Sequence, residues 1–264
     1  MTDIVLQTVA RKPTYCLNTY GENQDDPNSD WLNETMLNFI SKRKNEINNM
    51  QSDEKVGSNL FDILLTLNTP LDPNNYDGSE APLTDQEICS TITEVSVGGT
   101  DTTGNIFCYT IWLLAKHPKV LTHFQKEISE ILESARIFTF VPLTPHVSTQ
   151  ESIIRGNHLE ANTNFFVGHE IIHKLPEFWE NPDEFIPERF LDNEIAKHSF
   201  IPFGGGTRIC PGKNMSNVEL KALLILLFRI YDVELVDKVS EKPNIKYSFF
   251  YQCLDMKVVV RPRC

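Results

Sequence analysis

The residues best suited to chemistry form a glycine-rich loop that contains a cysteine. Residues 203–212 read Phe-Gly-Gly-Gly-Thr-Arg-Ile-Cys-Pro-Gly. Successive glycines carry no side chains and tolerate positive φ angles, so the backbone can approach a large flat group. Cys210 precedes an apolar, helix-like segment whose free N–H groups, together with the charge of Arg208, would favour a thiolate. Such a thiolate suits either attack on an electrophile or ligation of a soft metal.

Two other interpretations compete with the thiolate. One is an ordinary turn in which Cys210 is a small buried hydrophobe, the usual state of a free cysteine. The other is a phosphate-binding loop, because Gly206 and the pair Gly212-Lys213 resemble a Walker motif. Five residues rather than four separate Gly206 from Gly212, and Asn214 stands where Ser or Thr must hold magnesium. The spacing therefore excludes the phosphate-binding loop.

The segment after the loop has the apolar spacing of an amphipathic helix. Pro211 fits the first helical position, where no backbone N–H is required. We therefore expect a helix to begin directly after Cys210. Its apolar positions are Val218, Leu220, Leu223, Leu224, Leu227, Ile230 and Tyr231.

A second motif lies in the middle of a longer helical pattern. Thr84 and Glu87 form a capping box, and the apolar pattern continues to His117, which predicts a helix of more than thirty residues. Its middle, residues 98–103, reads Gly-Gly-Thr-Asp-Thr-Thr. These are poor helix formers, so we expect the helix to be opened or kinked there. The motif indicates either entry of a ligand or water, or close packing on another helix.

A third motif combines an acidic and a basic residue. Glu133 and Arg136 lie three apart in a predicted helix over residues 120–136, so their side chains share one face. Taken alone, such a pair on a surface contributes about 0.5 kcal/mol. Further helices are expected over residues 31–47 and 59–67. Short strands are expected over residues 152–154, 164–167, 247–250 and 256–260, which gives a mostly helical chain with a minor sheet.

Composition excludes several classes of protein. The 264 residues are 41% hydrophobic with a formal net charge of -12, which argues against nucleic acid or an anionic membrane surface as a partner. Six cysteines without C-x-x-C pairs indicate a reducing compartment. We expect no signal or transmembrane segment and an intracellular chain, since the longest apolar run is far below roughly 20 residues. Six of the seven histidines are interpreted as surface or packing residues: His117, His123, His158, His169, His173 and His198.

Together these motifs resemble the cytochrome P450 family. The cysteine loop matches the haem-binding pattern F-x-x-G-x-R-x-C-x-G, and residues 98–103 match A/G-G-x-D/E-T-T/S. Glu133 and Arg136 match the E-x-x-R pair, and residues 187–190 read Pro-Glu-Arg-Phe as in the family's P-E-R-F segment. The resemblance implies a mainly α fold with a minor β-sheet, the C-terminal portion of the cytochrome P450 fold. Residues 1–264 would be one partial domain, divided into a leading helical segment (1–83), a long central helix (84–117), and residues 118–264 with the E-x-x-R helix, short strands, haem loop and final helix.

The resemblance also implies a cofactor and roles for individual residues. The cofactor is haem, iron protoporphyrin IX ligated through a thiolate, and Cys210 is the axial ligand of its iron. Arg208 and His146 would meet the haem propionates, and Asp101 with Thr102 would relay protons to bound dioxygen. The other loop positions of the pattern are Phe203, Gly206 and Gly212. The ion network that braces the haem loop in this family would comprise Glu133, Arg136 and Arg189.

The implied activity is that of a haem-thiolate monooxygenase. It would insert one oxygen atom from dioxygen into a small apolar substrate, with electrons from an NADPH-dependent reductase or another donor. Lys213, Lys221 and Arg229 are candidate contacts for that donor, and members of the family often lie at the endoplasmic reticulum membrane. The resemblance covers only the C-terminal half of the family's domain. An alternative is therefore a truncated, inactive remnant with or without haem, and a hydrolase with a Cys/His pair is a more distant one.

Overall fold

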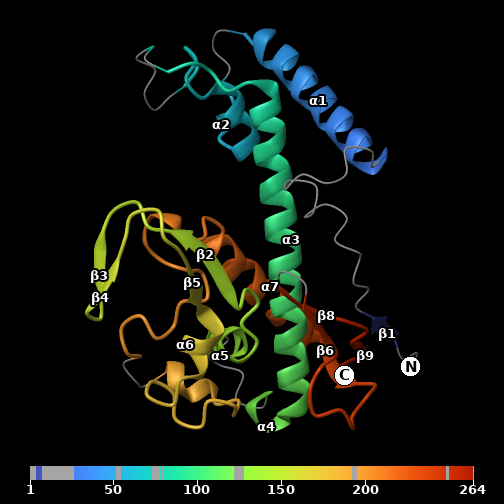
Figure 1. Ribbon diagram of the computed structural model, residues 1–264. Coiled ribbons are helices and arrows are strands. Elements are labelled where there is room, and N and C mark those ends of the chain that lie inside the picture. The colour runs from blue at the N-terminus through green and yellow to red at the C-terminus, as the bar shows by residue number, and fades with distance from the viewer. Residues whose placement is uncertain are drawn as a thin grey trace. The chain divides into compact units, whose positions relative to one another are not determined.

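The computed structural model describes residues 4–7, 27–51, 55–72, 78, 80–121, 128–191, 195–247 and 250–263 (Figure 1). The chain divides into two compact units. The smaller unit comprises residues 11–100, and the larger comprises residues 101–264 together with the first ten. Helix α3 (Asp85–Lys116) runs from the smaller unit into the larger.

The smaller unit contains helices α1 (Pro27–Asn48) and α2 (Leu60–Thr66) and the first half of α3. The predicted capping box at the start of α3 is confirmed. Thr84 N–H donates to Glu87 Oε2 at 2.8 Å, and Glu87 N–H donates to Thr84 Oγ1 at 3.2 Å. A small apolar core holds these helices together, and its buried members are Ile40, Ile47, Leu65, Ile88 and Cys89.

Helix α3 does not open at residues 98–103, contrary to the sequence-based expectation. All of its 32 residues are α-helical. The hydroxyl of Thr100 donates to the carbonyl of Ser96 at 2.7 Å, so this polar group is satisfied within the helix and does not disrupt it. A Cβ added at Gly98 or Gly99 would meet no atom of the described residues within 4 Å. These glycines therefore face open space and are not packed closely on another helix of the described chain.

Apart from α7 and the second half of α3, the described helices of the larger unit are short. The helix predicted over residues 120–136 is found as α4 and α5, and residues 122–127 between them lie outside the described part. The helical elements are α4 (Pro118–Leu121), α5 (Ile128–Ile137), α6 (His169–Lys174), two 3-10 turns (Pro187–Phe190 and Gly206–Arg208) and α7 (Lys213–Ile230).

Among its described residues, the larger unit also contains four small antiparallel sheets, so the fold is mainly helical with minor β-structure, as expected. Strand β9 lies between β1 and β6, and the pairs β2–β5, β3–β4 and β7–β8 form two-stranded sheets. The strands are β1 (Ile4–Gln7), β2 (Leu143–Val147), β3 (Ser152–Ile154), β4 (Asn157–Leu159), β5 (Asn164–Gly168), β6 (Tyr231–Leu235), β7 (Ile245–Tyr247), β8 (Tyr251–Cys253) and β9 (Lys257–Pro262).

Helix α7 differs from its sequence-based prediction at both ends. It begins at Lys213 with Gly212 as N-cap, so Pro211 precedes the helix and does not open it. Tyr231 is extended, with φ -126° and ψ 145°, because it begins β6 and pairs with Pro262. Only part of the predicted apolar set is buried, because one face of the helix packs on the core. Of the predicted residues, Leu220 and Leu224 are buried, whereas Val218, Leu223 and Ile230 are exposed.

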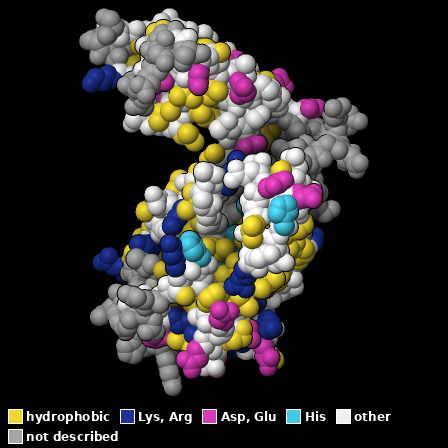
Figure 2. Space-filling view, turned by 60° about the vertical axis from the view of Figure 1, so that its left-hand side comes forward, with side chains coloured by type: hydrophobic (Ala, Val, Ile, Leu, Met, Phe, Trp, Pro, Cys, Tyr) yellow, Lys and Arg dark blue, Asp and Glu magenta, His cyan; other side chains and the backbone are white. Residues whose placement is uncertain are grey.

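The face of the larger unit seen in Figure 2 mixes hydrophobic side chains with both basic and acidic ones. Its buried core contains residues from the second half of α3, from α5 and α7, and from β6, β8 and β9. None of the described helices combines the length and the apolar content that crossing a bilayer requires.

Candidate functional site

The loop that carries Cys210 is closed by its own backbone. Cys210 N–H donates to the carbonyl of Phe203 at 2.9 Å, and Ile209 N–H donates to the carbonyl of Gly206 at 3.3 Å. Gly204 and Gly206 have φ angles of +72° and +65°, which only glycine adopts without strain. These contacts fix the direction in which the chain enters α7.

The thiol of Cys210 is exposed, which contradicts its interpretation as a small buried hydrophobe. A Cβ added at Gly205 or Gly206 would meet no described atom within 4 Å, so open space adjoins the loop. Within the described chain there is no group of three or more His, Cys, Asp or Glu side chains that could hold a metal ion. A single thiolate beside open space suits a metal whose other ligands come from its own cofactor, as in haem. The described residues around Cys210 therefore fit haem.

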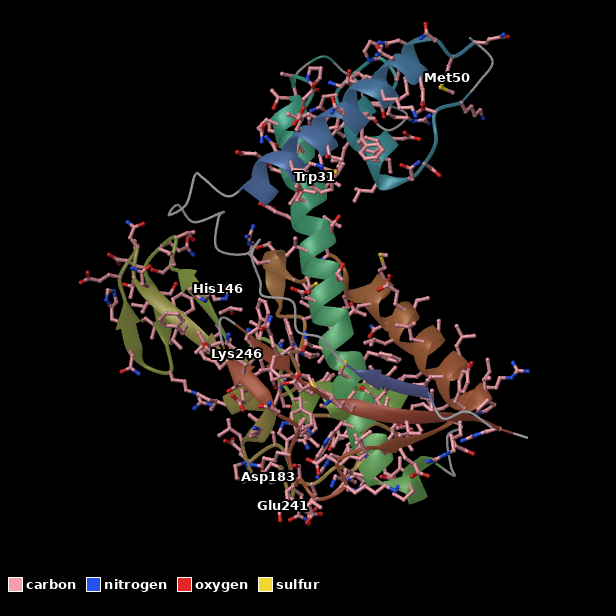
Figure 3. All side chains as sticks on the ribbon, turned by 90° about the vertical axis from the view of Figure 1, so that its right-hand side faces the viewer. Trp31, Met50, His146, Asp183, Glu241 and Lys246 are labelled. Carbon is pink, nitrogen blue, oxygen red and sulfur yellow. The ribbon has the colours of Figure 1, made fainter. Side chains whose placement is uncertain are left out.

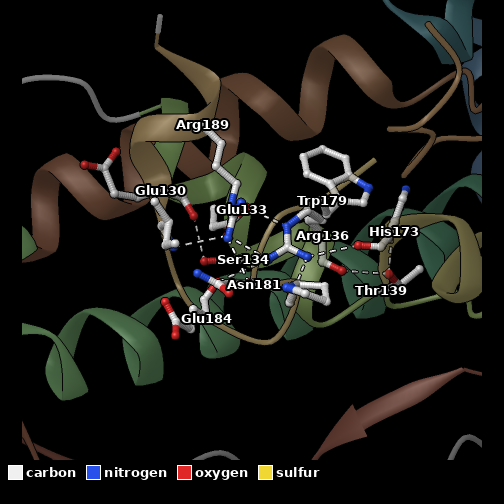
Figure 4. Close-up of polar contacts among 12 residues, drawn as sticks. Glu130, Glu133, Ser134, Arg136, Thr139, His173, Trp179, Asn181, Glu184 and Arg189 are labelled. Atoms are coloured by element: carbon white, nitrogen blue, oxygen red, sulfur yellow. Dashed lines mark hydrogen bonds and ion pairs between the residues drawn. The ribbon is translucent and has the colours of Figure 1, made fainter. Parts of the chain in front are cut away.

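The guanidinium of Arg136 is buried and uses all five of its N–H groups (Figure 4). Its Nε donates to Glu133 Oε2 and one Nη2 N–H donates to Glu133 Oε1, both at 2.7 Å. The other three N–H groups donate to the carbonyls of His173 at 2.9 Å, Pro182 at 2.7 Å and Glu184 at 3.2 Å. Arg136 therefore ties α5 to α6 and to the segment that follows it.

Glu133 connects the same pair to the 3-10 turn at Pro187–Phe190. Its Oε1 accepts the N–H of Ile186 at 3.1 Å and Nε of Arg189 at 3.3 Å. Arg189 also donates to the carbonyl of Asn181 at 2.9 Å. The structure thus brings Glu133, Arg136 and Arg189 together. Since the side chains of Glu133 and Arg136 have no exposed surface, breaking this pair would cost about 3–5 kcal/mol, far more than a surface pair.

Aromatic rings extend this network toward the cysteine loop. The Arg136 guanidinium lies 5.1 Å from the ring centroid of Trp179. The ring of Phe200 packs against Phe190 at 4.9 Å and against His173 at 5.3 Å between centroids. Phe200 directly precedes the segment that leads into the loop, so the packing holds the start of that segment.

His146 and Arg208 occupy separate places in the larger unit. His146 lies on β2, where its ring stacks on Phe165 of β5 with centroids 5.5 Å apart and its Nε2 lies 2.9 Å from Thr144 Oγ1 (Figure 3). Arg208 is exposed at the end of the 3-10 turn Gly206–Arg208. The contacts of the described residues do not join the two side chains.

Asp101 and Thr102 lie on α3 and are both half-buried. The carbonyl of Asp101 accepts from Asn105 Nδ2 at 2.8 Å, and Asn105 Oδ1 accepts the N–H of Cys253 at 2.7 Å. This part of α3 is therefore anchored to β8.

Sequence reasoning missed two residues at this site, His169 and His173. Both are buried on α6, and both contact the backbone of Ile201, two residues before Phe203. The available signal was their spacing, because residues four apart on a helix share one face. That signal is weak, and nothing in the sequence shows that the shared face meets the cysteine loop.

The cytochrome P450 family model matches residues 26–140 and 130–254, so the chain belongs to the cytochrome P450 family. It is 30% identical to "Cytochrome P450 4d2" of Drosophila melanogaster over 66% of this chain and 38% of that protein. It is 32% identical to "Dihydroniloticin synthase CYP71CD1" of Citrus sinensis over 72% of this chain and 41% of that protein. It is 27% identical to "Steroid 17-alpha-hydroxylase/17,20 lyase" of Peromyscus leucopus over 86% of this chain and 50% of that protein.

Solved structures show the same fold. The heme domain of cytochrome P450DA matches with a TM-score of 0.74 and 22% identity, over 89% of this chain and 55% of that one. A cytochrome P450 named CYP102L1 matches with a TM-score of 0.75 and 19% identity, over 89% of this chain and 56% of that one. The chain spans about half the length of the curated relatives and solved structures it matches. Membership of the family implies haem and, in general, a reductase partner.

Proposed function

We propose that this chain provides the thiolate-ligand half of a cytochrome P450 monooxygenase. The observation that carries the proposal is the exposed thiol of Cys210 on a loop whose backbone is closed on Phe203. Four motifs in family order support it. The family match over most of the chain makes haem the cofactor to test first.

Cys210 would hold the haem iron, and the glycine loop would face the ring. Arg208 and His146 would meet the propionates, with Phe203, Gly206 and Gly212 completing the loop. Thr144 Oγ1 lies 2.9 Å from Nε2 of His146, so Nδ1 is the ring nitrogen left to meet a propionate. Haem ligated through a thiolate supplies the activation of dioxygen for transfer of one oxygen atom to an apolar substrate.

Two further roles follow from the same proposal. Asp101 and Thr102 on α3 would hold and pass protons toward the space beside the glycines of that helix. An electron donor such as an NADPH-dependent reductase would dock near α7. Lys213 and Arg229 on this helix are exposed and Lys221 is half-buried, which suits an acidic partner surface.

The experiment is reconstitution of the chain with haem, followed by reduction and addition of carbon monoxide. We expect a strongly red-shifted Soret band, the signature of a thiolate ligand, and its loss in Cys210→Ser. Cys108→Ser is the matched control, because burial raises the pKa of that thiol to about 11 and keeps it protonated. A wild-type spectrum without the red-shifted band would contradict the proposal.

The partial coverage of the relatives favours a second candidate function. In this alternative the chain is a remnant of a monooxygenase and does not turn over substrate. The chain spans about half the length of its relatives, so its turnover has to be measured separately from its haem binding. Substrate-dependent consumption of NADPH by the haem-loaded chain with a reductase separates the two. Stoichiometric haem without consumption supports the remnant, and consumption that Cys210→Ser abolishes supports the enzyme.

A further inference from the structure

Two buried histidines of α6 contact the backbone N–H and the backbone carbonyl of one residue, Ile201, just before the cysteine loop. Ile201 N–H donates to Nε2 of His173 at 2.9 Å. The carbonyl of Ile201 lies 3.1 Å from Nδ1 of His169. His169 and His173 are 4% and 0% exposed. Both faces of the Ile201 backbone are therefore held by imidazole nitrogens shielded from water.

Hydrogen counting fixes the tautomer of His173. Its Nε2 receives a backbone N–H and therefore carries no proton, so the proton of the neutral ring is on Nδ1. Nδ1–H then donates to Thr139 Oγ1 at 2.8 Å, and that hydroxyl donates to the carbonyl of Arg136 at 3.0 Å. Arg136 in turn donates to the carbonyl of His173. His173 thus joins the Glu133–Arg136 pair to the segment that leads into the loop.

The same counting orders the contacts of His169. A carbonyl can only accept, so Nδ1 of His169 carries the proton that points at Ile201. In the neutral ring, Nε2 accepts from Thr144 Oγ1 at 2.9 Å. Thr144 Oγ1 must then accept from Nε2–H of His146, also at 2.9 Å. A directed chain of hydrogen bonds runs from His146 on β2 to the Ile201 carbonyl.

Backbone hydrogen bonds connect Ile201 to the turn that fixes Cys210. The Ile201 carbonyl also accepts the N–H of Gly204 at 3.0 Å, which closes the turn at the left-handed Gly204. Within that turn, Phe203 presents the carbonyl that accepts Cys210 N–H. Only one turn therefore separates the two histidines from the peptide that fixes Cys210.

We propose that His169 and His173 are positioning residues for Cys210. They clamp the backbone N–H and carbonyl of Ile201 and thereby set the turn from which the thiol is presented. His173 couples the loop to the buried network of α5, and His169 couples it to His146 on β2. The inference rests on the proposed function only in taking Cys210 as the haem ligand. The clamp, meaning the contacts of His169 and His173 with Ile201, is present in the haem-free chain.

The test is hydrogen exchange of the haem-free chain of 264 residues, read in peptides that cover residues 200–212. His169→Leu and His173→Leu should each speed exchange at the amides of Gly204 and Cys210 roughly five- to tenfold. His169→Gln should restore slow exchange, because its amide can donate to Ile201 and accept from Thr144. Should His173→Leu fail to fold, Thr139→Val replaces it, with a rise of about two- to fivefold at the same amides.

Tyr109→Phe is the matched control. It deletes a buried hydrogen bond of the same unit, from Tyr109 Oη to the carbonyl of Tyr251 at 2.9 Å, away from the loop. Exchange in residues 200–212 should not change in this variant. The proposal is overturned if both leucine variants stay within about twofold of wild type in this peptide, or if α7 accelerates as much as the loop.

Haem loading gives a second readout that separates this inference from the proposed function. If the wild type shows the red-shifted carbon monoxide band, His169→Leu and His173→Leu should lose part of it to a less shifted form, and His169→Gln should keep it. Equal spectra in all four proteins would overturn the inference. If the wild type binds no haem, the proposed function fails while the exchange result still decides the clamp.

Discussion

At the scale of single residues, burial decides which form of His173 the fold accepts. Burial lowers the pKa of His173 to about 3, and the positive charges of Arg136 and Lys174 act in the same direction. Burial also lowers the pKa of His169. Both directions agree with the hydrogen bonds, because protonated His173 could not accept the N–H of Ile201. The neutral rings are therefore part of the folded structure.

This pKa shift predicts that the chain loses stability on acidification. Between pH 6.5 and about 3 the unfolded chain binds a proton at His173 that the folded chain does not, so the free energy of unfolding rises with pH in that window. His173 alone contributes a slope of up to about 1.4 kcal/mol per pH unit. Urea unfolding at pH 7.5, 6.0 and 5.0 should show a steeper dependence in wild type than in His173→Gln.

His158→Gln is the control for the pH series, because His158 is exposed on β4 and should keep the wild-type slope. Wild type and His173→Gln carry the same carboxylates, so the difference between their slopes reports His173. Identical slopes for wild type and His173→Gln would show that His173 is not held neutral.

The identity and spacing of residues are visible in the sequence, but burial is not. The cysteine loop and the Glu133–Arg136 spacing could be recognised because each lies within a short stretch of chain. The contact of His173 with Ile201 joins residues 28 apart, and that of Arg136 with Pro182 joins residues 46 apart. Such contacts depend on how α5 and α6 pack, which a local pattern does not encode.

At the scale of elements, the second half of α3 is fixed to β8 by two side chains. Asn105 Oδ1 accepts the N–H of Cys253, and Tyr109 Oη donates to the carbonyl of Tyr251. Both contacts use backbone groups of β8 that do not take part in its pairing with β7. The helix that carries Asp101 and Thr102 is thus placed by residues one and two turns further along.

We expect Asn105→Ala to destabilise the chain by about 1–2 kcal/mol. The N–H of Cys253 would lose its partner in a buried position, at a cost of about 1–3 kcal/mol, and the better helix propensity of alanine offsets a few tenths. Urea unfolding measures the loss of stability. The rate of alkylation of Cys253 reports local opening around this residue. Burial raises the pKa of that thiol to about 12, so it should be inert in wild type and faster in the variant.

Two further substitutions are controls for Asn105→Ala. Asn105→Asp keeps an acceptor for Cys253 and should lose less. Glu94→Ala lies on the exposed face of the same helix and should be neutral. A loss in Glu94→Ala equal to that in Asn105→Ala would assign the effect to the helix as a whole.

Long elements with strong signals were predictable, and short ones that depend on partners were not. The 32-residue α3 follows from its capping box and apolar spacing, but its unbroken course through residues 98–103 does not. Propensity indicated an opening there, whereas the hydroxyl of Thr100 is satisfied by the preceding turn. Strand β6 was missed because Tyr231 continues the apolar spacing of α7, and its pairing with β9 is non-local.

At the scale of the whole molecule, the two units have cores of unequal size. In the described chain, sixteen buried apolar residues form the core of the larger unit and five form that of the smaller. Apolar burial is the main favourable contribution to folding, so the smaller unit has less to offset its conformational entropy. Its helices α1 and α2 should open more often than α5 and α7.

Hydrogen exchange of the full chain tests this difference, with one core substitution in each unit. In wild type, amides of α1 and α2 should exchange before those of α5 and α7. Ile40→Ala removes a fully buried side chain from the smaller core, at a cost of about 2–5 kcal/mol, and should accelerate α1 and α2 while leaving α5 slow. Leu224→Ala makes the same kind of cavity in the larger core and should accelerate α5 and α7. If either substitution accelerates both units equally, the two cores unfold as one cooperative structure and the Cys210 loop shares the stability of the smaller unit.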